Sequence, residues 1–206
     1  MAEVKIAIDD HTLDGILSIP NEATRMVVFA HGSGSSRLSP RNSHVAEVLN
    51  AAGIATLLFD LLTIQEERDV ANVFNVELLA KRILNGLHWV QSQPVLGTLP
   101  IGLFGASTGA AAALIASTDT PIEISAIVSR GGRPDLAGYL LERVPAPTLL
   151  IVGEKDVEVL VLNQVAAERL TCEHELVVIP GATHLFEESG TLDLAANAAR
   201  DWFLAH

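Results

Sequence analysis

Short apolar runs alternate with amphipathic or small-residue segments along most of the chain. A continuous apolar run predicts a strand that is covered on both faces, as in the middle of a parallel sheet. The runs that predict such strands are 26–30, 54–60, 101–104, 124–129, 147–153 and 175–179. Residues 4–8 and 15–19 instead alternate around a polar break at 9–14, which predicts an antiparallel hairpin at a sheet edge.

Helical signals fill the intervals between these runs. The expected helices cover about 40–52, 76–93, an alanine-rich segment after Ser107, a short piece ending near Glu142, 157–170 and the C-terminus, where Leu192, Ala195, Ala199 and Trp202 share one stripe. Residues 61–75 are polar and predict an exposed connection with a short helical piece. Alternating strands and helices predict an α/β fold with a mostly parallel, doubly wound sheet of about eight strands. Because no linker or repeat interrupts the pattern, we expect residues 1–206 to form a single domain.

The segment that carries the clearest chemical signal is Gly105-x-Ser107-x-Gly109, between an apolar strand and the alanine-rich helix. Glycines on both sides of a serine permit a very tight strand-to-helix turn, where side chains would collide with neighbouring backbone. Such a turn projects the serine hydroxyl above the carboxyl edge of the sheet, at the positive end of a helix. The bare motif is weak evidence, but its strand–turn–helix context predicts a nucleophile at Ser107.

A serine hydroxyl is a weak nucleophile at neutral pH and needs a base, which a third group orients. Asp156 and His184 follow the last two predicted strands, so their side chains should reach the same edge of the sheet as Ser107. Serine, then aspartate, then histidine is the chain order of a triad built on this type of sheet. We therefore expect Ser107, His184 and Asp156 to be nucleophile, base and orienting carboxylate. Asp135, which also follows a strand, is the alternative acid.

An acyl-transfer site also needs donors for the oxyanion. The backbone N–H of Thr108, directly after the nucleophile, is the first expected donor. The second should come from the loop after strand 26–30, which reads His31-Gly32-Ser33-Gly34. We expect the Ser33 N–H to be this donor, with Gly34 as the reserve, and His31 to be a structural residue that bonds to the backbone.

These elements together resemble the α/β-hydrolases, and in particular the small dienelactone-hydrolase-like branch. The matching elements are His31-Gly32 after a strand, Gly105-x-Ser107-x-Gly109, Gly153-x-x-Asp156 and Gly181-x-x-His184. The resemblance implies hydrolysis of an ester, thioester or lactone through an acyl-enzyme. Dienelactone hydrolases proper carry cysteine at the nucleophile position, whereas this chain has Ser107. Only a short segment separates Ser129 from Pro147, where larger relatives insert a lid, so we expect an open site for small or soluble acyl substrates.

The composition of the chain restricts the partners, the cellular location and the cofactors that we expect. The formal net charge of −12 argues against nucleic acid and anionic membranes as partners. No apolar stretch approaches a membrane span, and the N-terminal residues do not read as a secretory signal. The single cysteine, Cys172, fits a reducing compartment, and we expect a cytoplasmic monomer or homodimer. The scattered histidines have no metal-ligand spacing, so no metal or organic cofactor is expected.

Arginines near the predicted site suggest how a substrate could be recognised. Arg130 and Arg133 follow the strand beside that of Ser107, and either could bind a substrate carboxylate. Gly34 is a further candidate for contact with the substrate. Surface arginines paired with nearby carboxylates are the alternative for both, and for Arg37 and Arg41.

The expected function is hydrolysis of small carboxylic ester or thioester bonds. The same three side chains would also serve an acyltransferase, a peptidase or a carbon–carbon hydrolase. A non-catalytic binding protein on the hydrolase scaffold is the remaining hypothesis.

Overall fold

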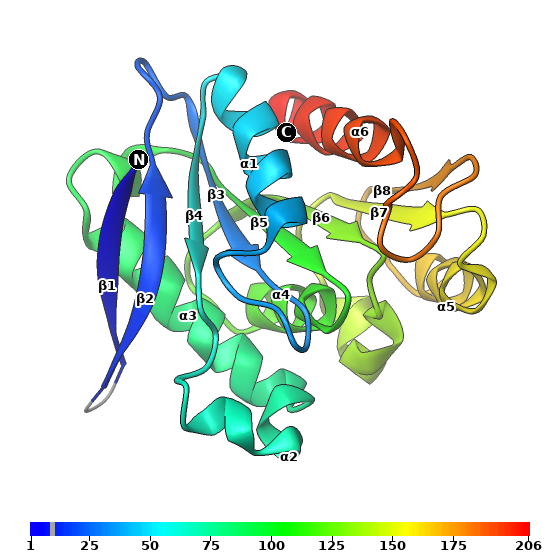
Figure 1. Cartoon of the computed structure of the whole chain (residues 1–206), viewed down its shortest axis with the longest axis horizontal. Helices are drawn as coiled ribbons and strands as arrows, with labels where there is room; N and C mark the ends of the chain where they lie inside the picture. Colours follow the sequence, from blue (N-terminus) through cyan, green and yellow to red (C-terminus); the bar gives the residue numbers. More distant parts are fainter. Residues whose placement is uncertain (9–10) are drawn as a thin grey trace.

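The computed structural model describes residues 1–8 and 11–206 and contains an eight-stranded sheet flanked by helices (Figure 1). The strands are β1 Ala2–Ile8, β2 His11–Ser18, β3 Arg25–Ala30, β4 Ile54–Phe59, β5 Ile101–Ala106, β6 Ile124–Arg130, β7 Thr148–Gly153 and β8 His174–Ile179. Their order across the sheet is β1-β2-β4-β3-β5-β6-β7-β8. β1, β2 and β4 pair antiparallel, and every pairing from β4 to β8 is parallel. This confirms the predicted fold class.

The N-terminal hairpin lies at the edge of the sheet as predicted, but the predicted polar break at 9–14 was too long. Residues 9–10 are outside the described residues, and residues 11–14 already belong to β2. Leu13 turns into the core, while Asp14 lies opposite Lys5 of β1 and forms an ion pair with it. A cross-strand pair of opposite charges stabilises a strand position that aspartate otherwise disfavours.

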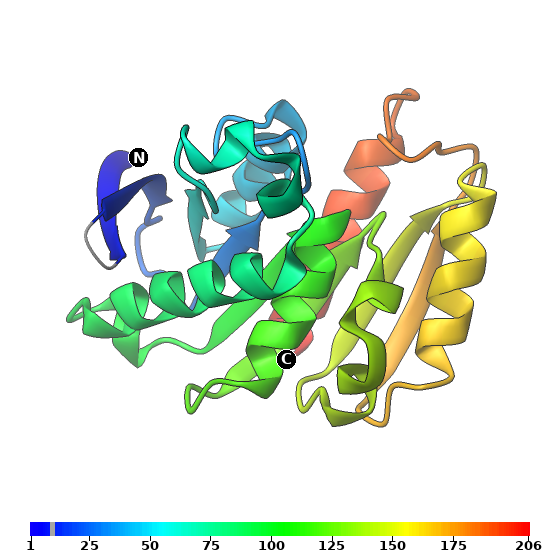
Figure 2. The ribbon, with the colours of Figure 1, turned by 90° about the horizontal axis from the view of Figure 1, so that it is seen from below.

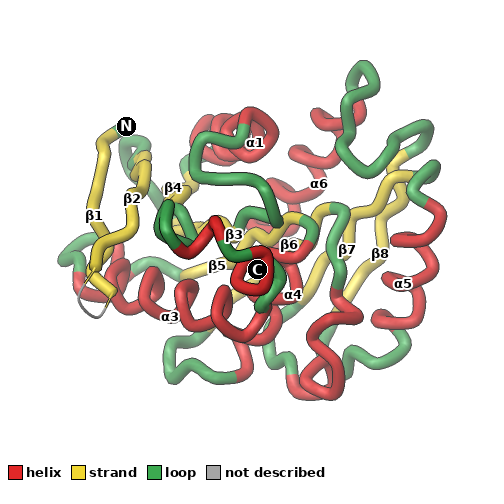
Figure 3. The backbone as a smooth tube through the Cα atoms, turned by 60° about the horizontal axis from the view of Figure 1, so that its bottom comes forward, coloured by secondary structure: helices red, strands yellow, loops and turns green. Residues whose placement is uncertain are grey.

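Helices cover both faces of the sheet (Figure 2). α1 (Pro40–Ala51) and α6 (Thr191–Ala205) pack on one face, and α3 (Val76–Ser92), α4 (Thr108–Thr118) and α5 (Val157–Ala167) pack on the other. Figure 3 shows the same two layers, with α1 and α6 on one side of the yellow strands. The remaining helical pieces are α2 (Val70–Val73) and three 3₁₀ segments, Glu66–Arg68, Leu96–Thr98 and Pro134–Arg143. No helix of the described part is both long and apolar enough to cross a membrane.

The C-terminal helix packs through a residue that the predicted stripe did not include. Phe203 is buried in the core under α6, whereas Trp202, which the stripe included, is half-buried. The Phe203 ring lies against Gly102 of β5, where a Cβ would come within 2.6 Å of a ring carbon. The glycine therefore makes room for the aromatic ring, a complementarity that helical periodicity cannot reveal.

The parallel strands bring the loops that follow β3, β5, β6, β7 and β8 to one edge of the sheet, as expected for this topology. Two strands extend further toward this edge than predicted. β5 continues to Ala106, and β6 continues to Arg130, which the sequence placed in a loop. The Arg130 side chain is therefore held by a strand end in the protein interior, where only 6% of the residue is exposed.

Candidate active site

Ser107 occupies a strained turn between β5 and α4. Its φ of 52° and ψ of −123° lie in a region that side-chain-bearing residues rarely adopt. The surrounding backbone holds this conformation: the Ser107 N–H donates to the Arg130 carbonyl (3.3 Å), and the Ser107 carbonyl accepts from the Arg133 N–H (3.1 Å). These bonds tie the turn to the loop after β6. The serine thus sits at the N-terminus of α4, at the sheet edge where the other loops meet.

Gly105 and Gly109 make this turn possible, as the sequence predicts. A Cβ on Gly105 would lie 2.4 Å from Ala110 Cα, and one on Gly109 would lie 2.3 Å from the Ala30 carbonyl oxygen. Both obstacles are backbone atoms, which cannot move without shifting β3 or α4. The absence of side chains at 105 and 109 is therefore a packing requirement of the turn.

We expect Gly109→Ala to lower the free energy of unfolding by at least about 3 kcal/mol, the upper range for overpacking, because the clash is with backbone. Gly53→Ala is the control: Gly53 also has an unusual backbone (φ +78°), but nothing lies within 4 Å of its Cβ position. That variant should lose only about 1–2 kcal/mol. Urea unfolding of both variants measures the difference, and equal losses would contradict the packing explanation.

His184 and Asp156 meet at the same edge. Asp156 precedes α5, and His184 lies in the loop after β8. His184 Nδ1 lies 2.6 Å from Asp156 Oδ2, a hydrogen-bonded contact between residues that are 28 positions apart in the chain. The Asp156 carboxylate is largely buried, with 14% of its side chain exposed. An ionised carboxylate accepts the Nδ1 proton, so this bond leaves Nε2 of a neutral imidazole free to accept a proton.

Ser107 and His184 line one cavity of about 230 Å³. Its other lining residues are Gly32, Ser33, Ser35, Ser39, Arg41, Asn42, Ala106, Arg130 and Leu185. Among the described residues no hydrogen bond joins Ser107 Oγ to His184, so the serine–histidine contact is open in this structure. Such contacts often tighten only when substrate is bound. The structure thus brings together Ser107, His184 and Asp156 from three separate loops.

The loop after β3 also lies here, but its N–H groups differ from the prediction. The Ser33 N–H, which we expected to be free for the substrate, donates to the Thr108 hydroxyl oxygen (2.9 Å). The Thr108 N–H belongs to the first turn of α4, where helical N–H groups have no partner within the helix. Gly34, with φ +67°, lies in the same loop. The N–H groups of Thr108 and Ser33 therefore both lie near Ser107, and the Ser33 N–H is already hydrogen-bonded to the Thr108 hydroxyl.

The two arginines proposed for substrate binding differ in their surroundings. Arg133 forms two hydrogen bonds of 2.8 Å with Asp135, and these bonds, together with the negative charge of Asp135, hold the Arg133 pKa above its ordinary value although burial acts to lower it. It is not among the residues that line the cavity, so the paired-arginine alternative holds for Arg133. Arg130 does line the cavity, and among described residues no carboxylate pairs with it. Asp135, the alternative triad acid, is thus engaged by Arg133, while His184 contacts Asp156.

His31 is a structural residue, which confirms that prediction. Its Nε2 accepts the Leu61 N–H (3.0 Å), and its Nδ1 lies 3.0 Å from the Gly32 carbonyl oxygen. These contacts require a neutral ring with the proton on Nδ1. Burial lowers the pKa of His31 below its ordinary 6.5, which favours the same neutral form.

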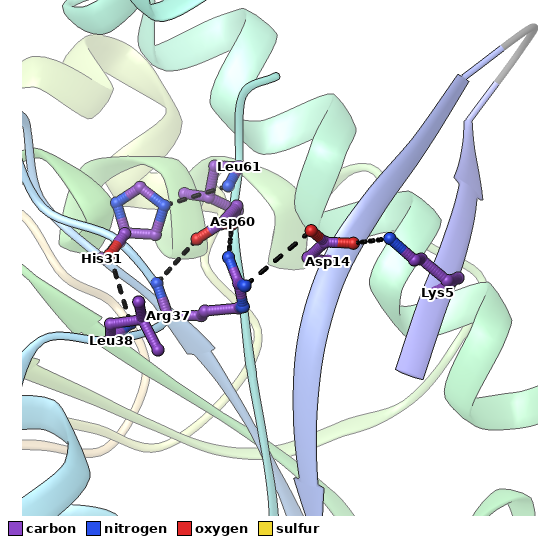
Figure 4. Close-up of polar contacts among 8 residues, drawn as sticks. Lys5, Asp14, His31, Arg37, Leu38, Asp60 and Leu61 are labelled. Atoms are coloured by element: carbon purple, nitrogen blue, oxygen red, sulfur yellow. Dashed lines mark hydrogen bonds and ion pairs between the residues drawn. The ribbon is translucent and has the colours of Figure 1, made fainter. Parts of the chain in front are cut away.

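An ion-pair chain continues from this region to the hairpin (Figure 4). Arg37 bonds Asp60 through its backbone N–H (2.8 Å) and its guanidinium, and it approaches Asp14 (3.8 Å), which in turn binds Lys5. A surface hollow of about 870 Å³ is lined by these residues, and Ser107 is not among its lining residues. Because its charged groups already pair with one another, we do not regard it as the active site. Of the two alternatives for Arg37, substrate binding and pairing with nearby carboxylates, these contacts favour the second.

We expect His31→Phe to lower the free energy of unfolding at pH 7.5 by about 1–3 kcal/mol, because the buried Leu61 N–H loses its acceptor. The pKa of His31 is lower in the folded protein than in the unfolded chain, so the unfolded chain takes up a proton first as the pH falls below 6.5. The stability that His31 contributes is therefore present above pH 6.5 and is lost below it. Urea unfolding at pH 7.5 and 5.5 should show a smaller gap between wild type and variant at pH 5.5. His88→Gln, at an exposed position of α3, is the control. If the difference in free energy of unfolding between wild type and His31→Phe is the same at both pH values, this account is contradicted.

Candidate metal ligands do not gather in the part of the chain that the structure describes. Among the described residues, no three His, Cys, Asp or Glu side chains lie close enough to hold an ion. Cys172 lies before β8, and burial raises the pKa of its thiol.

Comparison with known proteins agrees with this arrangement. A model of the alpha/beta hydrolase domain matches residues 23–201. The chain belongs to the α/β-hydrolase family. Within this family it has the lid-less, dienelactone-hydrolase-like form: a crystal structure of dienelactone hydrolase from Anabaena variabilis is 49% identical, with a TM-score of 0.95, covering 100% of this chain and 97% of that one.

Two further proteins are similar to this chain, one by its solved structure and one by its sequence. A serine hydrolase without a lid from Xanthomonas campestris shares the fold at 20% identity and a TM-score of 0.79, covering 98% of this chain and 94% of that one. A protein of Mycobacterium tuberculosis strain H37Rv, described as a putative phosphoribosyl transferase, is 56% identical over 204 residues. The match covers 99% of this chain but 46% of that protein. This α/β-hydrolase thus spans about half the length of the curated relatives it matches.

Sequence reasoning missed Asn42 and Ser39 as cavity residues. Both lie at the start of α1, where Ser39 is the N-cap and Pro40 the first helical residue. A serine–proline pair after a central strand is a helix-start signal, and it could have placed the first turn of this helix at the sheet edge. The contact between Asn42 and Arg130 joins residues 88 positions apart and has no such signal.

Proposed function

We propose that this α/β-hydrolase cleaves small carboxylic ester or thioester bonds through an acyl-enzyme on Ser107. The observation that carries the proposal is the 2.6 Å contact between His184 and Asp156 beside a cavity that Ser107 and His184 share. A serine in a strained turn, an oriented imidazole and a largely buried carboxylate form the combination that activates a hydroxyl. The family and the 49% identical dienelactone hydrolase support hydrolysis as the reaction class.

In the proposed mechanism, Ser107 Oγ attacks the substrate carbonyl while His184 Nε2 takes the hydroxyl proton. Asp156 holds the Nδ1 proton and stabilises the imidazolium that forms. The tetrahedral intermediate collapses when Nε2 returns the proton to the departing alcohol or thiol. Water then attacks the acyl-enzyme by the same proton transfers and releases the acid, so the enzyme returns to its starting state.

The proposed oxyanion donors are the backbone N–H groups of Thr108 and Ser33. In this assignment the Ser33 N–H exchanges the Thr108 hydroxyl for the developing oxyanion, so the Ser33 N–H is not left unpaired in the resting protein. A charged acceptor forms a stronger hydrogen bond than a neutral hydroxyl, which favours the exchange in the transition state. The Gly34 N–H is the reserve donor in the same loop.

The dimensions of the cavity support small substrates. About 230 Å³ lies below the 300–1,000 Å³ that is common for drug-sized ligands. A second hollow of about 300 Å³ shares Gly32, Ser33 and Ser35 with it and adds Leu62, Val73 and Leu79 to its wall. We propose that the acyl and leaving groups of one ester divide between these two spaces.

Phosphoribosyl transfer is not our proposal for this chain. That name describes a protein of which this chain matches 46%, and the matched part falls in the α/β-hydrolase family. The groups that meet at the cavity here, a serine and a histidine–aspartate pair, favour acyl transfer to water. The rest of that relative lies outside the match.

A panel of p-nitrophenyl esters of increasing acyl length tests the proposal, with free acid and nitrophenol quantified as products. We expect kcat/KM to be highest for the short acyl chains because the cavity is small. Added alcohols and amines show whether acceptors other than water are used. No turnover of any ester by folded protein would contradict hydrolysis, and transfer in preference to hydrolysis would favour an acyltransferase.

A further inference from the structure

The wall of the Ser107 cavity holds a buried positive charge without a counter-charge. Arg130 is 6% exposed, and its only side-chain hydrogen bond among described residues is from Nη2 to the Asn42 amide oxygen (3.1 Å). Its Nη1 is buried and has no acceptor there. The guanidinium otherwise lies over the rings of Phe104 and Phe186, 5.7 and 5.9 Å from their centroids. Burying an unpaired charge is costly, so such a group calls for an explanation.

The neighbours of Arg130 add positive charge. Burial, together with the charge of Arg41, lowers the pKa of Arg130 to about 10, which leaves it protonated at neutral pH. Arg41 lines the same cavity, and the one carboxylate within ion-pair distance of it among the described residues is that of the exposed Glu187, at 3.8 Å. The first turn of α1, from Ser39, contributes the positive end of a twelve-residue helix.

No acidic side chain offsets these charges inside the cavity. Among the described residues that line it, none is an aspartate or glutamate, in a chain whose net charge is −12. The adjoining hollow differs, because Glu67 lines it together with apolar side chains. The Ser107 cavity and the adjoining hollow therefore differ in the sign of the charged side chains that line them.

We propose that the cavity beside Ser107 binds an anionic oxygen group of the substrate, a carboxylate or a phosphate monoester, between Arg130, Arg41 and the N-terminus of α1. The preferred substrates are then small esters that carry this charge on one side of the scissile bond and a neutral group on the other. This inference rests on the proposed ester cleavage and names its substrate class. Guanidinium groups and helix N-termini are both established partners of such anions.

Matched ester pairs that differ in one charge test the inference. Monomethyl succinate against methyl succinamate places the carboxylate on the acyl side, and 4-acetoxybenzoate against 4-acetoxybenzamide places it on the leaving side. The phosphate arm is 4-acetoxyphenyl phosphate. For each pair the readout is the ratio of kcat/KM for the charged ester to that for its neutral partner. We expect wild type to prefer the charged ester in at least one pair by more than about 10-fold.

Arg130→Met should reduce this ratio by about 10-fold or more, since a charge-assisted contact is lost. Arg41→Gln, at a partly exposed position, should reduce it by about 3-fold. Arg133→Met is the matched arginine control, because Asp135 engages that side chain outside the cavity, and it should leave the ratio at the wild-type value. If Arg130 had a purely structural role, Arg130→Met would lower the melting temperature, or lower kcat/KM for the charged and the neutral ester equally, and the ratio of the two would not change.

Two outcomes overturn the inference: wild type prefers the charged ester in none of the arms, or the ratio survives Arg130→Met. If Arg130→Met does not fold, an unchanged ratio in Arg41→Gln has the same consequence. Failure of the proposed function is distinguishable, because then the neutral esters are not cleaved either. If the neutral esters are cleaved but the ratio in the arginine variants equals that of wild type, only the proposed anion site is contradicted.

Discussion

Ser107→Ala is expected to lower kcat for a short p-nitrophenyl ester by about 10⁴- to 10⁶-fold, the range for losing the nucleophile of a serine triad. The change removes the atom that forms the proposed acyl-enzyme and leaves the rest of the site in place. Ser107 also holds a strained backbone conformation, which alanine does not relieve, so stability should change little. Activity that remains should come from the oxyanion donors and from substrate binding.

The matched control for this prediction is Ser92→Ala, at an exposed position at the end of α3. Its kcat should equal that of wild type. Burst kinetics add a second readout, because an acyl-enzyme that accumulates gives a burst of nitrophenol in wild type and none in Ser107→Ala. If Ser107→Ala keeps kcat within tenfold of wild type, Ser107 is not the nucleophile.

Asp156→Asn is expected to lower kcat by about 10³- to 10⁴-fold, similar to the loss known for the corresponding change in serine-protease triads. The asparagine side chain preserves the size of the carboxylate but can donate an N–H toward His184 Nδ1. The imidazole then carries its proton on Nε2, where it can no longer accept the Ser107 proton. The loss should fall on kcat rather than on KM, because Asp156 is not among the residues that line the cavity.

Asp135→Asn is the matched control for Asp156→Asn, since Asp135 is the alternative acid of the sequence analysis. Its carboxylate binds Arg133, so we expect its kcat to stay within about 10-fold of wild type, as for a partly exposed ion pair. Steady-state kinetics of both variants at pH 8 decide between them. A larger loss at Asp135 than at Asp156 would reverse the assignment of the acid.

Much of the fold follows from local patterns. Apolar runs such as 101–104 and 147–153 identified central strands, because parallel strands are covered on both faces and need no alternation. The topology then places every loop after such a strand at one edge, so Ser107, Asp156 and His184 could be grouped from chain order alone. Glycines at 105 and 109 were recognisable because backbone contact excludes a side chain there.

Other features depend on contacts between distant segments, which no local pattern encodes. The predicted stripe of the last helix missed Phe203, because its burial depends on Gly102 in β5. The sequence left Arg130 and Arg133 equivalent, although they are three positions apart. A strand end carries Arg130 into the interior, and Asp135 holds Arg133 outside the cavity. The engagement of the Ser33 N–H by the Thr108 hydroxyl likewise depends on how two loops approach each other.

Electrostatics shows the same distinction between global and local properties. The net charge of −12 correctly describes the chain as a whole but predicts nothing about the sign of the potential beside Ser107. There, Arg41 and Arg130 meet with no acidic residue among those that line the cavity. We expect substrate preference to follow these local charges. The sequence offered Arg130 and Arg133 as equal candidates for a substrate carboxylate, and only the placed side chains single out Arg130.

Labelling with a fluorophosphonate, followed by peptide mass spectrometry, tests the central claim most directly. Such probes react with a serine that an adjacent base has activated. We expect a single adduct on the peptide that contains Ser107, no adduct in Ser107→Ala, and strongly slowed labelling in His184→Ala. An adduct on Ser33 or Ser35, which line cavities at the same edge, would contradict the assignment, as would ester turnover by protein that the probe does not label.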